Sequence, residues 1–195
     1  MGVVKLSTAG ILDYSKTPNF LSGNAPVSFG AFDLLETTTL TSSASSVTFS
    51  GLDSFSDYKH LQIRYVIRSD WGTTSSQNNI TFNSDTGSNY AYHLLIGSGS
   101  SVSSLGYTSR SFIYGGIGTG ANSATGAFGT GVIDILDFSA TKNTTVRTLN
   151  GANDINRIGL DSGLWINTSA VTSATVTSNQ GSYITGSRFS LYGVK

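Results

Sequence analysis

The chain has 195 residues, a formal net charge of zero at pH 7 and only 11% charged residues. Balanced, widely spaced charges give no electrostatic basis for binding nucleic acid, and the absence of cysteine excludes disulfides and thiolate metal sites. No run of 18 apolar residues occurs, and the first residues lack a signal-peptide core. We therefore expect no membrane insertion, and synthesis in a cytoplasm without secretion.

The composition favours β-structure. Hydroxyl residues and glycine dominate, with 32 serines, 24 threonines and 23 glycines. Serine and glycine disfavour helices, whereas threonine suits a pleated strand. Because 38% of the residues are hydrophobic and 11% are aromatic, the chain can build a core and is not expected to be disordered.

Residues 1–33 differ from the remainder of the chain. They contain both prolines, Pro18 and Pro26, and their apolar residues follow neither the helical nor the strand period. Such a segment cannot bury its apolar groups in an amphipathic element of its own. We predict an arm that anchors the chain to other proteins of an assembly; the alternative is an irregular wrap around its own domain. The anchoring residues would be Leu6, Ile11, Leu12, Tyr14, Phe20, Leu21 and Phe29.

Residues 34–195 show the pattern of strands. The clearest alternation runs from His60 to Arg68, with apolar residues on one face and polar residues on the other. Glycine-rich loops are expected at 97–101 and 115–126. We predict an all-β fold, an antiparallel, jelly-roll-like β-sandwich preceded by the irregular N-terminal arm. Further strands are expected at 34–40, 46–50, 79–83, 89–96, 111–115, 129–138, 144–149, 170–177 and 186–194.

The histidines and acids give little basis for catalysis. His60 and His93 are the only histidines, both lie in strand-like segments, and no GxSxG motif occurs. Asp134 and Asp137 would point to opposite faces of one strand, which separates them as a glycosidase pair. We expect Asp134 to pair with Arg147 and Asp137 to cap a turn. No enzymatic activity is expected; a glycan-cleaving enzyme is the least favoured alternative.

Two segments superficially match ligand-binding motifs. Gly116–Ala121 reads GIGTGA, but no helix follows that could hold a dinucleotide phosphate, so a flexible loop is expected. Asn83–Asn89 offers oxygen ligands without the spacing of a calcium loop. A turn is favoured there, and a calcium ion near Asp85 is the alternative. No cofactor is expected.

One aromatic residue is a candidate for ligand contact. Trp71 lies in the segment SDWGTTSSQNN, where an exposed ring among hydroxyls and amides could stack on a sugar. Trp71, Gln77 and Asn78 therefore form a candidate contact loop for a host-surface glycan. The alternative is a loop folded onto the edge of the sandwich. Trp165, in a strand-like context, is expected in the core.

Seven stretches of the sequence are distinctive: AGILDYSKTPNFLSGNAP, LLETTTLTSSASSVTFSGL, DYKHLQIRYVIRS, ITFNSDTGSNYAYHLLIGSGSSV, VIDILDFSATKNTTVRTLNG, LWINTSAVTSATVT and SRFSLYGVK. They resemble jelly-roll-like virion surface proteins of marine and cyanobacterial tailed phages. The resemblance covers most of the chain from Leu34 onward and includes the arm. These are motifs of the fold, so no functional residue carries over from the family.

The resemblance implies a protein displayed on the surface of a virus particle. The expected role is a tail fibre or receptor-binding appendage, held to other virion proteins through residues 1–33. The alternative is a capsid decoration protein, in which the same arm would clamp capsomers. The family type also implies a homo-oligomer, and a homotrimer is expected.

Overall fold

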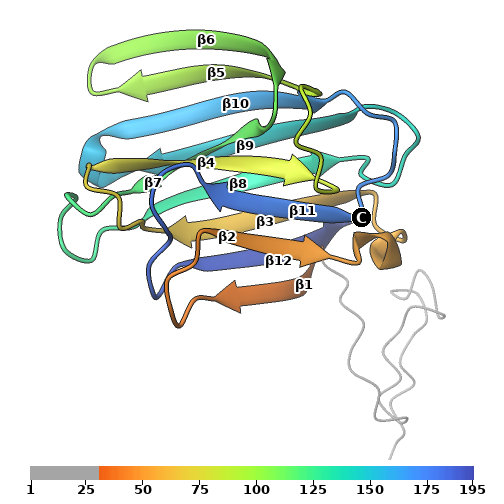
Figure 1. Ribbon diagram of the computed structural model, residues 1–195, viewed down its shortest axis with the longest axis horizontal. Coiled ribbons are helices and arrows are strands. Elements are labelled where there is room, and N and C mark those ends of the chain that lie inside the picture. The colour runs from red at the N-terminus through yellow and green to blue at the C-terminus, as the bar shows by residue number, and fades with distance from the viewer. Residues whose placement is uncertain (1–30) are drawn as a thin grey trace, which may run out of the picture. The chain divides into compact units, whose positions relative to one another are not determined.

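The computed structural model describes residues 31–195, which form two antiparallel sheets packed as a β-sandwich (Figure 1). The predicted all-β sandwich is therefore confirmed. The predicted arm lies outside the described residues except for its last three, and the first strand already begins at Phe32. The anchoring residues all lie outside the described residues: Leu6, Ile11, Leu12, Tyr14, Phe20, Leu21 and Phe29.

Twelve strands and two short 3₁₀ helices make up the sandwich. The 3₁₀ helices are η3 (Leu52–Phe55) and η4 (Asn153–Ile155). The strands are β1 (Phe32–Thr39), β2 (Ser46–Ser50), β3 (His60–Ile67), β4 (Ser75–Phe82), β5 (Tyr90–Ser98), β6 (Ser101–Arg110), β7 (Ile113–Thr119), β8 (Gly129–Leu136), β9 (Thr144–Ala152), β10 (Arg157–Trp165), β11 (Ser173–Ser178) and β12 (Arg188–Val194).

The strand order is that of an elaborated jelly roll. One sheet has the order β2-β11-β4-β7, and the other has the order β1-β12-β3-β8-β9-β10-β5-β6. Successive strands from β2 to β5 alternate between the two sheets, as in paired Greek keys. The meander β8-β9-β10 fills the place of a single strand between β3 and β5, and β12 with β1 extends the larger sheet beyond β3.

The core follows the alternation seen in the sequence. Leu61, Ile63, Tyr65 and Ile67 of β3 are at most 1% exposed, which confirms the predicted inward face. Trp165 is also buried, as predicted, and packs against the ring of Phe82 at a centroid distance of 5.6 Å. Burial of these side chains is the main source of stability of the fold.

Four strands differ most from the predictions. β4 begins at Ser75 instead of residue 79, and two whole strands, β6 and β10, were not predicted. β6 is exposed on both faces and therefore has no apolar alternation. The fourth strand that differs is β7, whose entirely buried residues include five of the twelve residues of the glycine-rich segment predicted as a loop.

The glycines of β7 and β8 serve close packing between the sheets. Gly116 has a φ of +97°, which disfavours any L side chain, and a Cβ there would overlap the hydroxyl group of Tyr65. A Cβ on Gly131 of β8 would overlap the same ring. The Tyr65 hydroxyl points toward the carbonyl of Ile117 at 3.4 Å. The GIGTG run is therefore a buried strand that accommodates Tyr65, and the predicted flexible loop is wrong for these residues.

Replacing Gly131 by alanine tests this packing. The added methyl group would overlap the buried Tyr65 ring, so we expect a loss of about 2–4 kcal/mol in the free energy of unfolding, measured by urea denaturation. Gly72→Ala is the control, because nothing lies within 4 Å of the position that its Cβ would take, and it should change stability by less than about 0.5 kcal/mol. Equal stabilities of the two variants would refute the close contact.

Candidate functional site

The predicted glycan-contact residues do not form one loop. Trp71 is 40% exposed in the segment between β3 and β4, whereas Gln77 and Asn78 belong to β4 itself. The Asn78 side chain is fully buried and accepts a hydrogen bond from the Tyr183 hydroxyl group at 3.0 Å. Asn78 is therefore a core residue and cannot contact a surface ligand. Gln77 is half-buried and donates to the Asn79 side chain.

The two histidines lie on separate strands of the large sheet. His60 on β3 accepts a hydrogen bond at Nδ1 from the backbone N–H of Asp137, at 2.8 Å. His93 lies on the exposed face of β5, and β8, β9 and β10 separate the two strands. His60 thus has a structural contact, and the fold does not bring the histidines together.

The acidic residues of β8 and the following turn form local ion pairs. Asp134 lies directly opposite Arg147 across β8 and β9, with 3.2 Å between Oδ2 and Nη2, which confirms the predicted pair. Asp137 has a φ of +49° at the turn after β8 and forms an ion pair with Lys142. The hydrogen bond from Lys142 is the first cause of the lowered pKa of Asp137. Both acids are partly exposed, so these pairs contribute little to stability.

The oxygen-rich segment Asn83–Asn89 forms a turn that protein donors already occupy. The Asp85 carboxylate accepts hydrogen bonds from Trp165 Nε1 at 2.8 Å, from Gly87 N–H at 2.9 Å and from Asn89 Nδ2 at 3.0 Å. These donors, Trp165 first, hold the pKa of Asp85 below its usual value. Within residues 31–195, no cluster of three histidine or acidic side chains could hold a metal ion.

The outer face of the large sheet reverses the usual burial pattern. On β9 and β10 the outward-pointing residues include Leu149, Ile158 and Leu160, which are 53%, 60% and 54% exposed. Their strand neighbours that point inward are Asn150 and Asp161, which are 4% and 3% exposed. We call the outward group, with Leu95 of β5, the inverted face. Leu160 lies directly opposite both Leu149 and Leu95, so the apolar side chains are contiguous.

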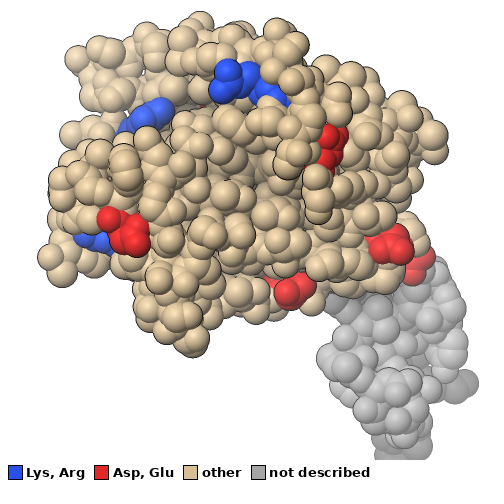
Figure 2. Space-filling view, in the orientation of Figure 1, with Lys and Arg blue, Asp and Glu red and all other residues tan. Residues whose placement is uncertain are grey.

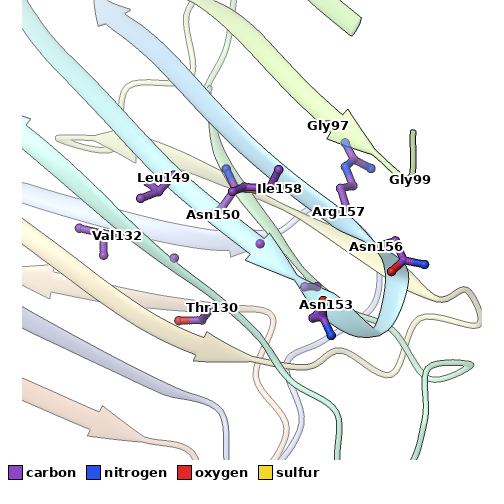
Figure 3. Close-up of a pocket in the computed structure, with 13 residues that line it drawn as sticks. Gly97, Gly99, Thr130, Val132, Leu149, Asn150, Asn153, Asn156, Arg157 and Ile158 are labelled. Carbon is purple, nitrogen blue, oxygen red and sulfur yellow. The ribbon is translucent and has the colours of Figure 1, made fainter. Parts of the chain in front are cut away.

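A groove of about 960 Å³ crosses the inverted face (Figure 3). It forms because Ile158 lies opposite Gly151 on β9 and Gly97 on β5, two outward positions without side chains. Val132 and Leu149 extend its apolar wall along β8 and β9. Figure 3 shows these aliphatic side chains along the strands, with polar side chains at the end where β9 turns into β10. The polar residues there are Asn153, Asn156 and Arg157.

The chemistry of the groove suits a protein partner. None of its lining residues is aromatic or acidic, so it offers no ring for stacking on a sugar and no carboxylate pair for hydrolysis. Aliphatic walls with amides and one guanidinium at the end fit an aliphatic side chain next to a backbone or carboxylate acceptor. The inverted face is therefore the strongest candidate for a functional surface among the described residues.

Beneath the inverted face lies a buried polar cluster. Asn150 Nδ2 donates to Asp161 Oδ2 at 2.7 Å, and Arg157 Nη2 lies 3.4 Å from the Tyr114 hydroxyl group. Burial raises the pKa of Asp161 to about 7, and the Asn150 hydrogen bond and the charge of Arg157 oppose this only in part. The cluster explains the inversion locally, because these inward positions hold polar groups that cannot contribute to the apolar core.

The sequence contains a signal for the inverted face, which was missed. β10 reads RIGLDSGLW and does alternate, but its aliphatic residues alternate with glycine and aspartate. The two sets therefore point to opposite faces, and only the packing of the second sheet decides which face is inside. Unless the register of β10 with β5 and β9 is known, the sequence cannot show that the apolar side of this strand faces solvent.

The sequence matches no protein-family model, and no curated protein proves similar to it. Among residues 31–195, no helix is both long and apolar enough to cross a membrane.

The raised pKa of Asp161 predicts a pH-dependent stability. The carboxyl group of Asp161 has a pKa near 3.8 in the unfolded chain and about 7 in the folded protein. Its protonation therefore stabilises the folded state. This stabilisation is complete below pH 3.8 and is lost as the pH rises through 7. Asp161→Asn cannot ionise and should be about 1–3 kcal/mol more stable than the parent at pH 8. Urea denaturation from pH 4 to pH 8 measures both proteins.

Asp53→Asn is the control, because Asp53 is an exposed acid in η3. Its stability curve should run parallel to that of the parent. A difference between Asp161→Asn and the parent that stays constant from pH 4 to pH 8 would contradict the buried, protonated carboxyl group.

Proposed function

We propose that this chain is a non-enzymatic structural protein of a tailed-phage particle, exposed on the virion surface as a tail fibre or receptor-binding appendage. The observation that carries the interaction role is the inverted face, where contiguous aliphatic side chains point away from the protein's own core. The virion assignment draws on the sequence stretches that resemble phage surface proteins. The sandwich is consistent with that resemblance.

The inverted face has the size and chemistry of a contact surface. Exposed apolar residues that occur singly need no explanation, but a contiguous group on one sheet indicates a binding site. Burying the aliphatic side chains of Leu95, Leu149, Ile158 and Leu160 would contribute about 1–2 kcal/mol each before the costs of association. A neighbouring virion protein is the partner that we propose for this face.

The opposite side of the sandwich has a different chemistry. On the outer face of the four-stranded sheet, Thr48, Thr175 and Thr81 lie side by side on β2, β11 and β4, and the Thr48 and Thr175 hydroxyl groups are 2.9 Å apart. Figure 2 shows this side, with few charged side chains and most of them near its margin. A hydroxyl-rich, weakly charged face stays hydrated, which suits the side of an appendage that faces the host.

A capsid decoration protein is the second candidate function. The inverted face favours it to the extent that a broad sheet surface with exposed aliphatic side chains can lie flat on a lattice of capsid subunits. The number of copies per particle separates the two roles. Hundreds of copies per particle would exclude the appendage role and favour the decoration role.

Variants of the inverted face test the contact role. Ile158→Ser combined with Leu160→Ser removes two exposed aliphatic side chains and should leave the sandwich folded, because both point to solvent. We expect incorporation into particles, measured by quantitative mass spectrometry of purified virions, to fall by about tenfold or more. The matched control is Thr48→Ser with Thr175→Ser on the other sheet, which should assemble normally. Normal incorporation of the Ile158 and Leu160 variant would exclude this face as the contact.

Trp71 tests the receptor-binding role separately. Its ring is 40% exposed among hydroxyl and amide groups, and the Asn122 side chain nearby bonds the Gly72 carbonyl. If the ring stacks on a host glycan, Trp71→Ala should weaken binding of the protein to host cells by about tenfold, whereas Trp71→Tyr should retain most of it. Binding that is unchanged in Trp71→Ala would exclude this residue from the receptor site.

A further inference from the structure

Strand β6 forms an open edge of the large sheet. It is the last strand in the sheet order and pairs with β5 alone among the described strands. Nine of its ten residues are exposed, including Val102, Leu105 and Tyr107 at 76%, 45% and 37%. Edge strands are commonly protected by charges, proline or bulges that block further pairing. β6 has a bulge only at its end, where the register with β5 shifts between Tyr107 and Arg110. From Ser101 to Tyr107 the strand contains neither proline nor any charged residue.

The hairpin that leads into β6 shows which backbone groups are free. A two-residue turn, Gly99 and Ser100, joins Ser98 to its partner Ser101, and Gly99 has the positive φ of the hairpin turns with glycine first. In such a hairpin the two residues that close the turn, Ser98 and Ser101, form both backbone hydrogen bonds with each other, and so does every second pair after them. The residues between these pairs on β6 point their backbone groups away from β5. The N–H and C=O groups of Val102, Ser104 and Gly106 therefore point to the open edge.

We propose that β6 pairs in antiparallel fashion with β6 of a second copy of this chain, about a two-fold axis at Ser104. Each copy would contribute the free backbone groups of Val102, Ser104 and Gly106. The pairing would join the two eight-stranded sheets into one continuous sheet.

The sequence of β6 is complementary to itself in this register. Val102 of one copy lies opposite Gly106 of the other, Leu105 lies opposite Ser103, and Tyr107 lies opposite Ser101. Every large side chain thus meets a small one, and each such contact occurs twice across the axis. The one charged residue of the strand, Arg110, lies at its end, where its guanidinium is 5.4 Å from the Tyr107 ring centroid.

The absence of charge favours a second copy over other partners. An acidic or basic peptide would find no complementary charge between Ser101 and Ser109, whereas two identical uncharged strands meet without repulsion. The proposal goes beyond the virion role and does not depend on it. It also differs from the expected homotrimer, because a two-fold axis gives a dimer.

A cysteine at the proposed axis gives a direct test. The chain has no cysteine, so Ser104→Cys in the full-length protein carries a single thiol. In the proposed dimer this thiol faces the same thiol of the second copy across the axis. Opposite residues of an antiparallel pair lie within the Cα separation that a disulfide requires. We expect most of the protein to form a disulfide-linked dimer under mild oxidation. Ser43→Cys, equally exposed in the loop between β1 and β2, should remain largely monomeric on a denaturing gel.

A charge at the same position gives the second test. Ser104→Lys should keep the fold, because the residue is exposed, but it places two like charges at the axis. Analytical ultracentrifugation should show a dimer for the parent and for Thr48→Lys on the other sheet, and a dissociation constant raised by about tenfold or more for Ser104→Lys. A parent protein that is monomeric or trimeric, or cross-linking of Ser104→Cys no greater than that of Ser43→Cys, would overturn the proposal.

Discussion

The sandwich depends on the close approach of its two sheets around the ring of Tyr65. The ring lies between the strands, where Gly116 of β7 and Gly131 of β8 carry no side chain that could overlap it. Protein interiors are packed so densely that even one methyl group at such a place must displace a neighbour. Because the contact joins β3 and β8 of one sheet to β7 of the other, it sets how closely the layers can approach.

The inverted face follows from the same close packing. β7 lies over β9 and β10, and the inward positions in the middle of β10 are small or polar: Gly159, Asp161 and Gly163. A Cβ on Gly163 would overlap Ile113 of β7. Large side chains are excluded from the middle of that side, and the aliphatic residues Ile158 and Leu160 point to solvent. A constraint inside the sandwich thus accompanies an aliphatic outer surface at β9 and β10.

The parts of the fold that the sequence reveals are those in which burial and strand period agree. β3 has one apolar and one polar face, and it was predicted within a residue of its bounds. The cross-strand pair of Asp134 and Arg147 was also predictable, because an acid in an apolar strand needs a partner. β7 was predicted only at its start, as part of 111–115, because its glycines indicate a loop unless the opposing ring of Tyr65 is known. β6 was missed because a strand with both faces exposed carries no alternation.

The candidate site was less predictable than the fold. Trp71 is exposed as its context suggested, but Asn78 lies in the core because β4 begins earlier than its polar sequence indicated. The inverted face depends on which side of β9 and β10 meets the second sheet. That information belongs to the register between distant strands and is absent from any single segment.

The position of β12 has a consequence for how the protein is made. β12 lies between β1 and β3, so strands from the first third of the described residues remain unpaired on one side until Arg188–Val194 is available. β2 likewise has no partner strand in its sheet until β11 has been synthesised. Contacts so distant in sequence slow folding, because a long loop must close before they form. On the ribosome, β1 and β3 would emerge early and stay open to wrong pairing until translation reaches β12.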